Sequence, residues 1–206
     1  MQNEILGHVS FAAQYAKDMD DGRESWVHAV NRVEQMHLKK FAENFVDISD
    51  QIRWAFDLVR DKRVFPSQRS MQFGGHAIMS NNMRIYNCTF SYCDRIKFFA
   101  EAFYLLLCGC GVGFSVRRRH VERLPGLVRF DDWQSRPKKT YVIADNIEGW
   151  SNAVLHLLTS YFKANFYDMN HLYEYEFDYS LIRKKGAPIS SGIGKAPGPE
   201  PLRIAI

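Results

Sequence analysis

The stretch from Ser67 to Val116 constrains the fold of this chain most strongly, because it places an apolar helical segment between two β-prone segments. The first β-prone segment is Cys88–Tyr92, and a glycine-rich turn leads from the helical segment into the second, Val112–Val116. A helix that is apolar on most sides packs between layers, as in an α/β fold. The order therefore predicts a β-α-β unit with Cys88 at the start of its first strand.

The ends of this central helix also have sequence signals. Asp94 is its expected N-cap, and Gly109 suits its C-terminal turn. Upstream, we expect a turn over Ser67–Gly75 that includes the pair Gly74-Gly75. One stripe of the helix should face the interior; it comprises Phe99, Ala102, Phe103, Leu106 and Leu107, and Phe98 and Leu105 widen it.

Residues 1–66 are predicted to be mostly helical, because apolar side chains recur at helical spacing. A second helix of this region has Asp47 or Ser49 as its candidate N-cap and ends before Pro66, since the residue before proline avoids the α region. The expected stripes are Val27, Val30, Val33, His37 and Phe41 in one helix, and Ile52, Ala55, Phe56 and Val59 in the other.

A second β-α-β step follows the first along the chain. Thr140–Ile143 and Glu174–Tyr179 are the expected strands, and a capping box from Asp145 to Glu148 begins the helix between them. Two successive units of this kind favour a parallel sheet or barrel. The helix should bury Trp150, Ala153, Val154, Leu157, Leu158 and Tyr161.

Composition excludes several classes of protein. The 206 residues are 46% hydrophobic, enough for a sizeable core, yet no apolar run is long enough to span a membrane. The first residues do not resemble a signal peptide, so we expect a cytoplasmic protein. A net charge of +4 suits anionic small molecules and does not indicate nucleic-acid binding. The basic run Arg117–His120 is expected to be a solvated turn, with a phosphate or partner contact as the alternative.

The four cysteines are expected to be reduced in such a protein. Their spacings, Cys88-x4-Cys93 and Cys108-x-Cys110, form a poor zinc pattern, and no metal site is predicted. Cys93, Cys108 and Cys110 are interpreted as structural, and an isolated cysteine such as Cys88 is ordinarily a small buried hydrophobe. A small zinc-binding protein nevertheless stays open as an alternative.

The run from Gly109 to Phe114 has a superficial likeness to a dinucleotide-binding fingerprint. That fingerprint needs a strand before it and a helix after it. The order here is reversed, so we interpret these glycines as allowing a tight turn or the close approach of a ligand to the backbone.

Three motifs together carry a family resemblance. YNCTFSYC at residues 86–93, the glycine-rich segment 108–116 and SLIRKKGAPISSGIGKAPGPEPL at residues 180–202 resemble the adenosylcobalamin-dependent (class II) ribonucleotide reductases. The resemblance runs from Glu24 to Ile206 and concerns only the N-terminal part of such an enzyme. It implies an α/β fold with an N-terminal helical region (1–66), followed in 67–206 by the first β-α-β units of an incomplete ten-stranded α/β barrel that ends in a specificity-loop-like tail.

The resemblance also implies site residues. Cys88 corresponds to one of the two cysteines that reduce the ribose, and it is the expected catalytic residue. Two thiols that close to a disulfide supply the electrons and protons needed to remove a 2′-hydroxyl as water. The implied substrate-binding residues are Ser70, in a turn Ser70-Met71-Gln72, with Asn87, Gly111 and Gly113; the implied effector-sensing residues of the specificity loop are Gly192, Gly194 and Lys195.

The implied activity is conversion of ribonucleotides to 2′-deoxyribonucleotides by thiyl-radical chemistry. Adenosylcobalamin, the radical-forming cysteine and the second reducing cysteine would be held mainly outside this chain. The expected partners are a complementary C-terminal reductase chain, a ribonucleotide, a deoxynucleotide effector and a thioredoxin-type reductant, with no membrane and no nucleic acid. The chain alone is expected to be inactive, and a catalytically inactive nucleotide-binding fragment is a further alternative.

Overall fold

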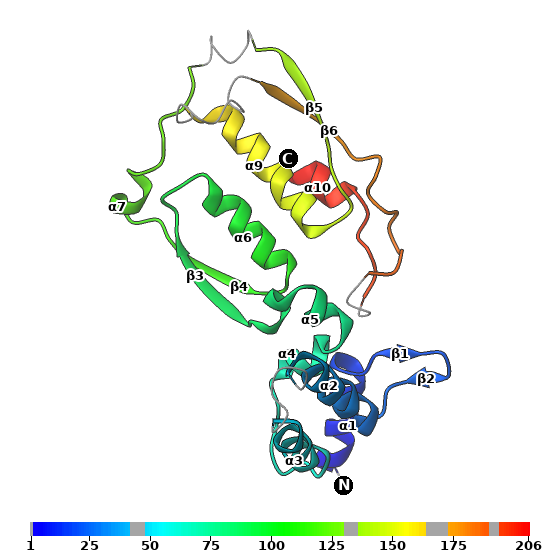
Figure 1. Cartoon of the computed structure of the whole chain (residues 1–206). Coiled ribbons are helices and arrows are strands. Elements are labelled where there is room, and N and C mark those ends of the chain that lie inside the picture. Colours follow the sequence, from blue (N-terminus) through cyan, green and yellow to red (C-terminus); the bar gives the residue numbers. More distant parts are fainter. Residues whose placement is uncertain (1, 42–47, 130–135, 164–172, 190–193) are drawn as a thin grey trace. The chain divides into compact units, whose positions relative to one another are not determined.

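The computed structural model describes residues 2–41, 48–129, 136–163, 173–189 and 194–206 (Figure 1). They form two compact units. The first comprises residues 1–86 and 188–194, and the second comprises residues 87–187 and 195–206. The compact units therefore divide after Tyr86, whereas the domain division at residues 66 and 67 stays a prediction about the whole protein.

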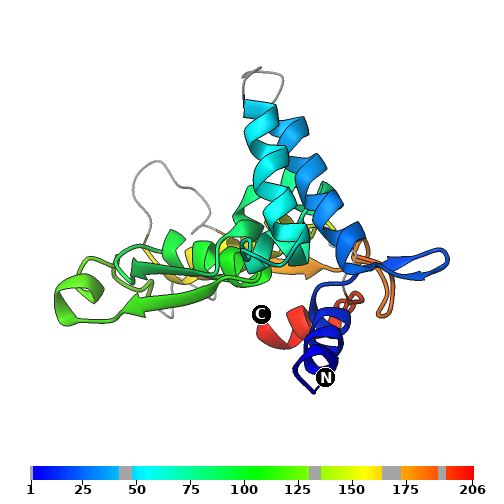
Figure 2. The same ribbon diagram turned by 90° about the horizontal axis from the view of Figure 1, so that it is seen from below.

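The first unit begins with three helices and a hairpin. Its elements are α1 (Gln2–Gln14), β1 (Asp18–Met19), β2 (Gly22–Arg23), α2 (Trp26–Phe41) and α3 (Ile48–Arg60). Figure 2 shows α2 and α3 side by side. The antiparallel hairpin of β1 and β2 had no signal in the hydrophobic pattern.

The core of this unit lies between α2, α3 and the segments that follow. Val30 and Val33 are fully buried there with Phe56 and Val59, as their spacing predicts. Val27 and Phe41 were expected on the same stripe, but both are exposed at the two ends of α2. Of the two predicted caps of α3, Asp47 lies outside the described residues, and Ser49 lies inside the helix.

The expected turn over Ser67–Gly75 is wrong for most of its length. The chain forms α4 (Gln68–Phe73), then α5 (His76–Ser80) and the 3-10 helix η1 (Asn82–Ile85). Ser67 caps α4, because its side chain accepts a hydrogen bond from the Ser70 N–H at 3.4 Å. The turn is confined to Gly74 and Gly75, and Gly75 has a φ of +95°, a conformation that favours glycine.

A network of buried charges holds this turn. The guanidinium of Arg32 forms two hydrogen bonds to the Glu24 carboxylate, at 2.6 and 2.8 Å, and donates to the carbonyl oxygens of Gly74 (2.8 Å) and Met71 (3.0 Å). Lys17 Nζ donates to the same Gly74 oxygen at 3.0 Å. The pair of Arg32 and Glu24 thus joins α2, the hairpin and the end of α4.

Burial and neighbouring charges shift the pKa values in this network. Burial is the largest cause that lowers the pKa of Lys17 to about 8, followed by the nearby positive charge of Arg32, while Glu24 partly offsets both. For Glu24, burial alone would raise the pKa, but hydrogen bonds from Arg32 and from the Lys17 backbone N–H outweigh it and lower the pKa.

The second unit contains the predicted β-α-β unit. Its elements are β3 (Cys88–Tyr92), α6 (Lys97–Leu107) and β4 (Gly111–Ser115), and the two strands are parallel. The bounds of β3 agree with the prediction, and β4 begins one residue earlier than predicted. Gly109 has a φ of +89° after the helix, which agrees with its expected place in the C-terminal turn.

Two expectations about α6 are wrong. Its N-cap is Ile96, which makes no side-chain cap, whereas Asp94 forms ion pairs with Arg95 and Arg123. The buried residues are Phe98 and Ala100, and Leu106 is 55% exposed. The predicted stripe is thus wrong at Leu106, whereas Phe98, expected to widen it, is buried with its ring 5.7 Å from that of Phe114 of β4, and Phe103 packs against the core of this unit.

The second β-α-β step is also present. It consists of β5 (Lys138–Val142), α9 (Ile147–Tyr161) and β6 (Glu174–Asp178), with β5 and β6 parallel. Asn146, not Asp145, caps α9, because the Asn146 Oδ1 accepts from the Gly149 N–H at 2.7 Å. Asp145 instead accepts from Arg183 Nε at 2.6 Å. The core here includes Ile143, Ala153, Ile182 and Leu202, the last from α10 (Glu200–Ala205).

In the second unit α6 packs against α9, and the two strand pairs lie to either side of these helices (Figure 1). Among the described residues no ladder joins β3–β4 to β5–β6. The fold is thus mixed α/β with short parallel sheets, in agreement with the predicted class. In the part of the chain that the structure describes, no helix has both the length and the apolar character needed to cross a membrane.

Candidate functional site

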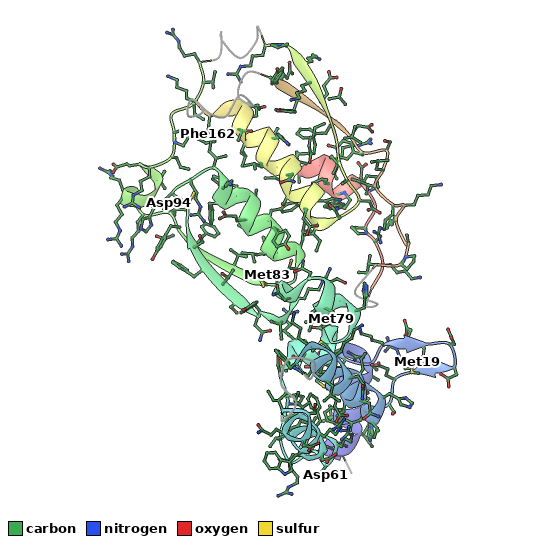
Figure 3. All side chains as sticks on the ribbon, in the orientation of Figure 1. Met19, Asp61, Met79, Met83, Asp94 and Phe162 are labelled. Carbon is green, nitrogen blue, oxygen red and sulfur yellow. The ribbon has the colours of Figure 1, made fainter. Side chains whose placement is uncertain are left out.

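Cys88 is the first residue of β3 and has a free, exposed thiol. Side chains alternate between the two faces of a strand, so Cys88 shares its face with Phe90 and Tyr92. All three are exposed, whereas Thr89 and Ser91 on the opposite face are half-buried. The view with all side chains shows residues standing on the β3–β4 pair along its length (Figure 3). The sulfur is therefore accessible at one end of an uncovered sheet face.

Two glycines of β4, Gly111 and Gly113, lie on this face, and a β-carbon would meet different surroundings at the two positions. Gly113 pairs with Phe90, and a β-carbon at position 113 would lie 3.3 Å from Phe90 Cδ2, a tight contact. Gly111 pairs with Cys88, and a β-carbon there would meet Asn87 O at 3.7 Å and Cys88 Sγ at 3.9 Å, both ordinary contacts. Neither glycine is among the residues with positive φ.

Packing within this chain therefore explains Gly113 but not Gly111. A β-carbon at position 111 would make only ordinary contacts, so no clash within this chain requires glycine beside the Cys88 sulfur. Glycine allows a ligand to approach the backbone closely. The geometry suits a ligand that reaches Cys88 Sγ over the backbone of Gly111.

Asn87 directly precedes the strand and is exposed. Its backbone carbonyl accepts a hydrogen bond from the Gly111 N–H at 2.8 Å, which extends the ladder beyond Cys88. The backbone on either side of the thiol is thus fixed by β4. Asn87, Cys88, Gly111 and Gly113 are the predicted site residues that the structure brings together.

The other end of this face carries a cluster that the sequence did not reveal. His120 is buried at 6% exposure, its Nδ1 and Ser115 Oγ are hydrogen-bonded at 3.0 Å, and its ring lies 4.4 Å from that of Tyr92. The sequence had placed His120 in a solvated basic run. Side chains alternate between the two faces of a strand, so the β-prone run Cys88–Tyr92 was enough to place Phe90 and Tyr92 on the face of the thiol. The contact between Tyr92 and His120 depends on tertiary structure and had no signal in the sequence.

The three remaining cysteines are buried and form no disulfide, which fits their structural interpretation. Burial, and secondly the charge of Asp94, raise the pKa of the Cys93 thiol. A raised pKa keeps a thiol protonated and unreactive. Cys88 is the only one of the four cysteines with an accessible sulfur.

The other predicted site residues lie elsewhere. Ser70 is not in a turn but inside α4, where it is buried in the first unit. Gly194 is exposed with a φ of +84°, and Lys195 is exposed as well. Gly192 lies outside the described residues. The roles of these four residues remain predictions.

Within the described ranges, no three histidine, cysteine or acidic side chains gather as they would around a metal ion. This holds for the segment around Cys88 and for the surroundings of Cys108 and Cys110.

Known proteins resemble the chain over nearly its whole length. An adenosylcobalamin-dependent ribonucleoside-triphosphate reductase of Euglena gracilis is 27% identical over 219 residues, which cover 96% of this chain and 28% of the relative. Relatives from Dictyostelium discoideum (26% identical) and Mycobacterium phage D29 (24% identical) are assigned to the same enzyme, and 29% and 31% of their lengths are covered. No protein-family model matches.

A solved structure shares the fold. The crystal structure of a B-12 dependent (class II) ribonucleotide reductase superimposes with a TM-score of 0.72 and 22% identity, covering 96% of this chain and 35% of that one. The chain thus spans about a third or less of the length of the proteins it matches. The resemblance first suggested by the motifs around Cys88 is confirmed: over almost all of its residues, this chain is similar to one part of a class II ribonucleotide reductase.

Proposed function

We propose that this chain supplies the part of a class II ribonucleotide reductase that presents one thiol of the reducing pair to the ribose. The observation that carries the proposal is that Cys88 is exposed and forms no disulfide, and that it pairs with Gly111, where a β-carbon would meet only ordinary contacts. Similarity over almost all of the chain to reductases of this type supports it. Asn87 and Gly113 complete the proposed substrate-facing edge.

The chemistry requires two thiols. When the 2′-hydroxyl is removed, the C2′–O bond breaks, a C2′–H bond forms and water leaves. Two thiols together give up two electrons and two protons and become a disulfide. Cys88 supplies one of them. The second comes from the rest of the protein, because the other three cysteines of this chain are buried.

A thioredoxin-type reductant would then restore both thiols by disulfide exchange. A cytoplasmic location suits this cycle, because thiols stay reduced there. None of the four cysteines forms a disulfide in the structure, which is compatible with such a setting.

The finer fold is part of the proposal. We place residues 67–206 in the first β-α-β units of a ten-stranded α/β barrel and residues 1–66 in a helical region beside it. Within the described part of the chain, β3–β4 and β5–β6 are separate two-stranded sheets, and further strands could pair with their outer edges. The remaining strands and the second reducing cysteine would belong to further sequence, in the same or in a complementary C-terminal polypeptide.

Adenosylcobalamin would supply the radical that starts the reaction. The corrin ring already supplies four ligands to the cobalt, so a cobalamin site needs no cluster of protein donors, and the cofactor is proposed here from the family resemblance alone. We assign its binding to the remaining part of the protein.

We propose that the deoxynucleotide effector binds the specificity-loop-like segment that contains Gly194 and Lys195. Gly194 has the backbone freedom of a loop that changes shape, and the exposed ammonium of Lys195 can reach a phosphate or a base. Gly192 is included only on the basis of the sequence motif. Ser70 stays a weaker member of the substrate pocket, because its burial in α4 requires the backbone of that helix to make the contact.

Reconstitution tests the proposal. The chain is combined with a polypeptide that covers the remaining part of a class II reductase, with adenosylcobalamin, a ribonucleoside triphosphate and a dithiol. We expect deoxynucleotide product from the wild-type chain and loss of product from Cys88→Ser. Cys93→Ala is the matched control, since it removes a buried thiol just beyond the other end of β3 and should retain activity.

Two results would contradict the proposal. Undiminished product from Cys88→Ser would remove the role of that thiol. Nucleotide binding without product in every combination would instead support an inactive nucleotide-binding fragment.

A further inference from the structure

A surface rich in arginine follows β4. It comprises Val116, Arg117, Arg118, Arg119, Val121 and Arg123, and we call it the arginine surface; it includes the short helix α7 (Arg118–Val121). All six residues are exposed. Figure 1 shows α7 beyond the ends of β3 and β4 that are distant from Cys88.

The backbone of this surface is fixed by a buried anchor. His120 lies between the arginines in sequence, but its side chain points inward, where it contacts Ser115 and Tyr92, the last residues of the two strands. The His120 N–H also donates to the Arg117 carbonyl at 2.8 Å, and the Glu122 N–H donates to the Arg118 carbonyl at 2.9 Å. The three consecutive arginines are exposed, but the contacts of the buried His120 fix the backbone that carries them.

The positive charge of the arginine surface is compensated only in part. Four arginines face one nearby carboxylate within this segment, that of Glu122, and Arg118 approaches it only at 4.0 Å with its own side chain 89% exposed. Asp94 accepts a 3.7 Å ion pair from Arg123. For Arg117 and Arg119, no ion pair occurs with any described residue. Excess charge of one sign attracts a partner of the opposite sign.

Two features favour a polypeptide over a small anion. Successive residues of a helix are rotated by about 100°, so Arg118 and Arg119 spread their charges over a broad area instead of directing them at one phosphate. The exposed side chains of Val116 and Val121 lie among the arginines and offer apolar contact area that a phosphate would not use. Arginine combined with apolar side chains is typical of protein–protein interfaces.

We propose that the arginine surface binds an acidic polypeptide segment that also carries apolar side chains. The surface is distinct from the proposed catalytic edge, because Cys88 and Tyr92 are four residues apart along β3, about 13 Å. Binding there is independent of the reductase chemistry.

The test uses the full 206-residue chain and a fluorescent synthetic peptide in which glutamate and leucine alternate. Anisotropy measures its affinity for the wild-type chain and for Arg117→Gln/Arg118→Gln/Arg119→Gln. We expect the triple variant to bind about tenfold more weakly or worse, since each exposed ion pair contributes modestly and three are removed. Added salt should weaken wild-type binding. The matched control, Lys39→Gln/Lys40→Gln/Arg53→Gln, removes three exposed positive charges on α2 and α3 and should bind like the wild type.

Cys88→Ser should also bind the peptide like the wild type, which separates this proposal from the reductase proposal. The proposal is overturned if the wild type does not bind the peptide, or if the triple variant binds it equally well. It is also overturned if inorganic tripolyphosphate binds more tightly than the peptide and loses its affinity in the triple variant, because the surface would then be a phosphate site.

Discussion

Cys88 and Gly111 face each other across two parallel strands, and a β-carbon on residue 111 would lie 3.9 Å from the Cys88 sulfur. Because this contact is an ordinary van der Waals distance, a methyl group at position 111 would lie beside the sulfur without a clash. At the neighbouring pair, Phe90 and Gly113, a β-carbon on residue 113 would lie 3.3 Å from Phe90 Cδ2, which is a tighter contact.

Substitution at position 111 should shield the thiol without disturbing the fold. Gly111→Ala meets only ordinary contacts, so we expect an unchanged melting temperature or a small gain from the stiffer unfolded chain. Alkylation of Cys88 by iodoacetamide should slow in Gly111→Ala and slow further in Gly111→Val. Gly113→Ala is the control, since its new methyl meets Phe90 instead of the sulfur. Equal alkylation rates in wild type and Gly111→Val would show that a side chain at position 111 does not shield the thiol.

The four cysteines should alkylate in two widely separated phases. Cys88 is exposed and should react first, whereas Cys108 and Cys110 are buried and Cys93 combines burial with a raised pKa. Mass spectrometry of the native chain should find one label at short times, located at position 88. Cys88→Ser should lose that fast phase, and urea should expose the other three thiols. A fast label at position 93 in the folded chain would contradict this assignment.

Local patterns in the sequence predicted the central unit well. The bounds of β3 follow from the β-prone run Cys88–Tyr92, and Gly109 was correctly placed in the turn after α6. The capping residues were less predictable, because Asp145 and Asn146 are adjacent and both are good N-cap types. Only the tertiary partner Arg183, which pairs with Asp145, decides that Asn146 becomes the cap.

Features that depend on register between strands could not be predicted. Sequence alone treated Gly111 and Gly113 alike, and only the pairing of β3 with β4 shows that one faces a sulfur and the other an aromatic ring. The same applies to His120, which a basic run hides until its contacts with Ser115 and Tyr92 are seen. The network around Arg32 is likewise formed by residues far apart in the chain.

Loss of Arg32 should destabilise the first unit strongly. Its ion pair with Glu24 is largely buried, with side-chain exposures of 15% and 7%, so Arg32→Met would leave a buried carboxylate without its partner. Breaking a buried pair in this way costs about 3–5 kcal/mol. Arg53→Met is the matched control, because its pair with Asp50 has exposures of 58% and 96% and should cost less than about 1 kcal/mol. Urea unfolding measures both, and similar losses in the two variants would refute a special role for the buried pair.

Stability should depend on pH through Lys17. The folded chain holds the pKa of Lys17 at about 8, below the ordinary 10.5, chiefly through burial. Between these two pH values the unfolded chain keeps a proton that the folded chain has released, so the free energy of unfolding rises with pH across this window. Below pH 8 both states are protonated, and the burial of the charge costs stability that the rise recovers.

Urea titrations at several pH values between about 8 and 10.5 should reveal this slope in the wild type and a smaller slope in Lys17→Met, because methionine has no proton to release. Subtracting the two curves removes the contribution of other groups that titrate in the same range. Lys39→Met, at an exposed position of α2, should keep the wild-type slope. A wild-type slope in Lys17→Met would mean that another group releases the proton, and the hydrogen bond from Lys17 to Gly74 would then have to be formed by a charged amine throughout.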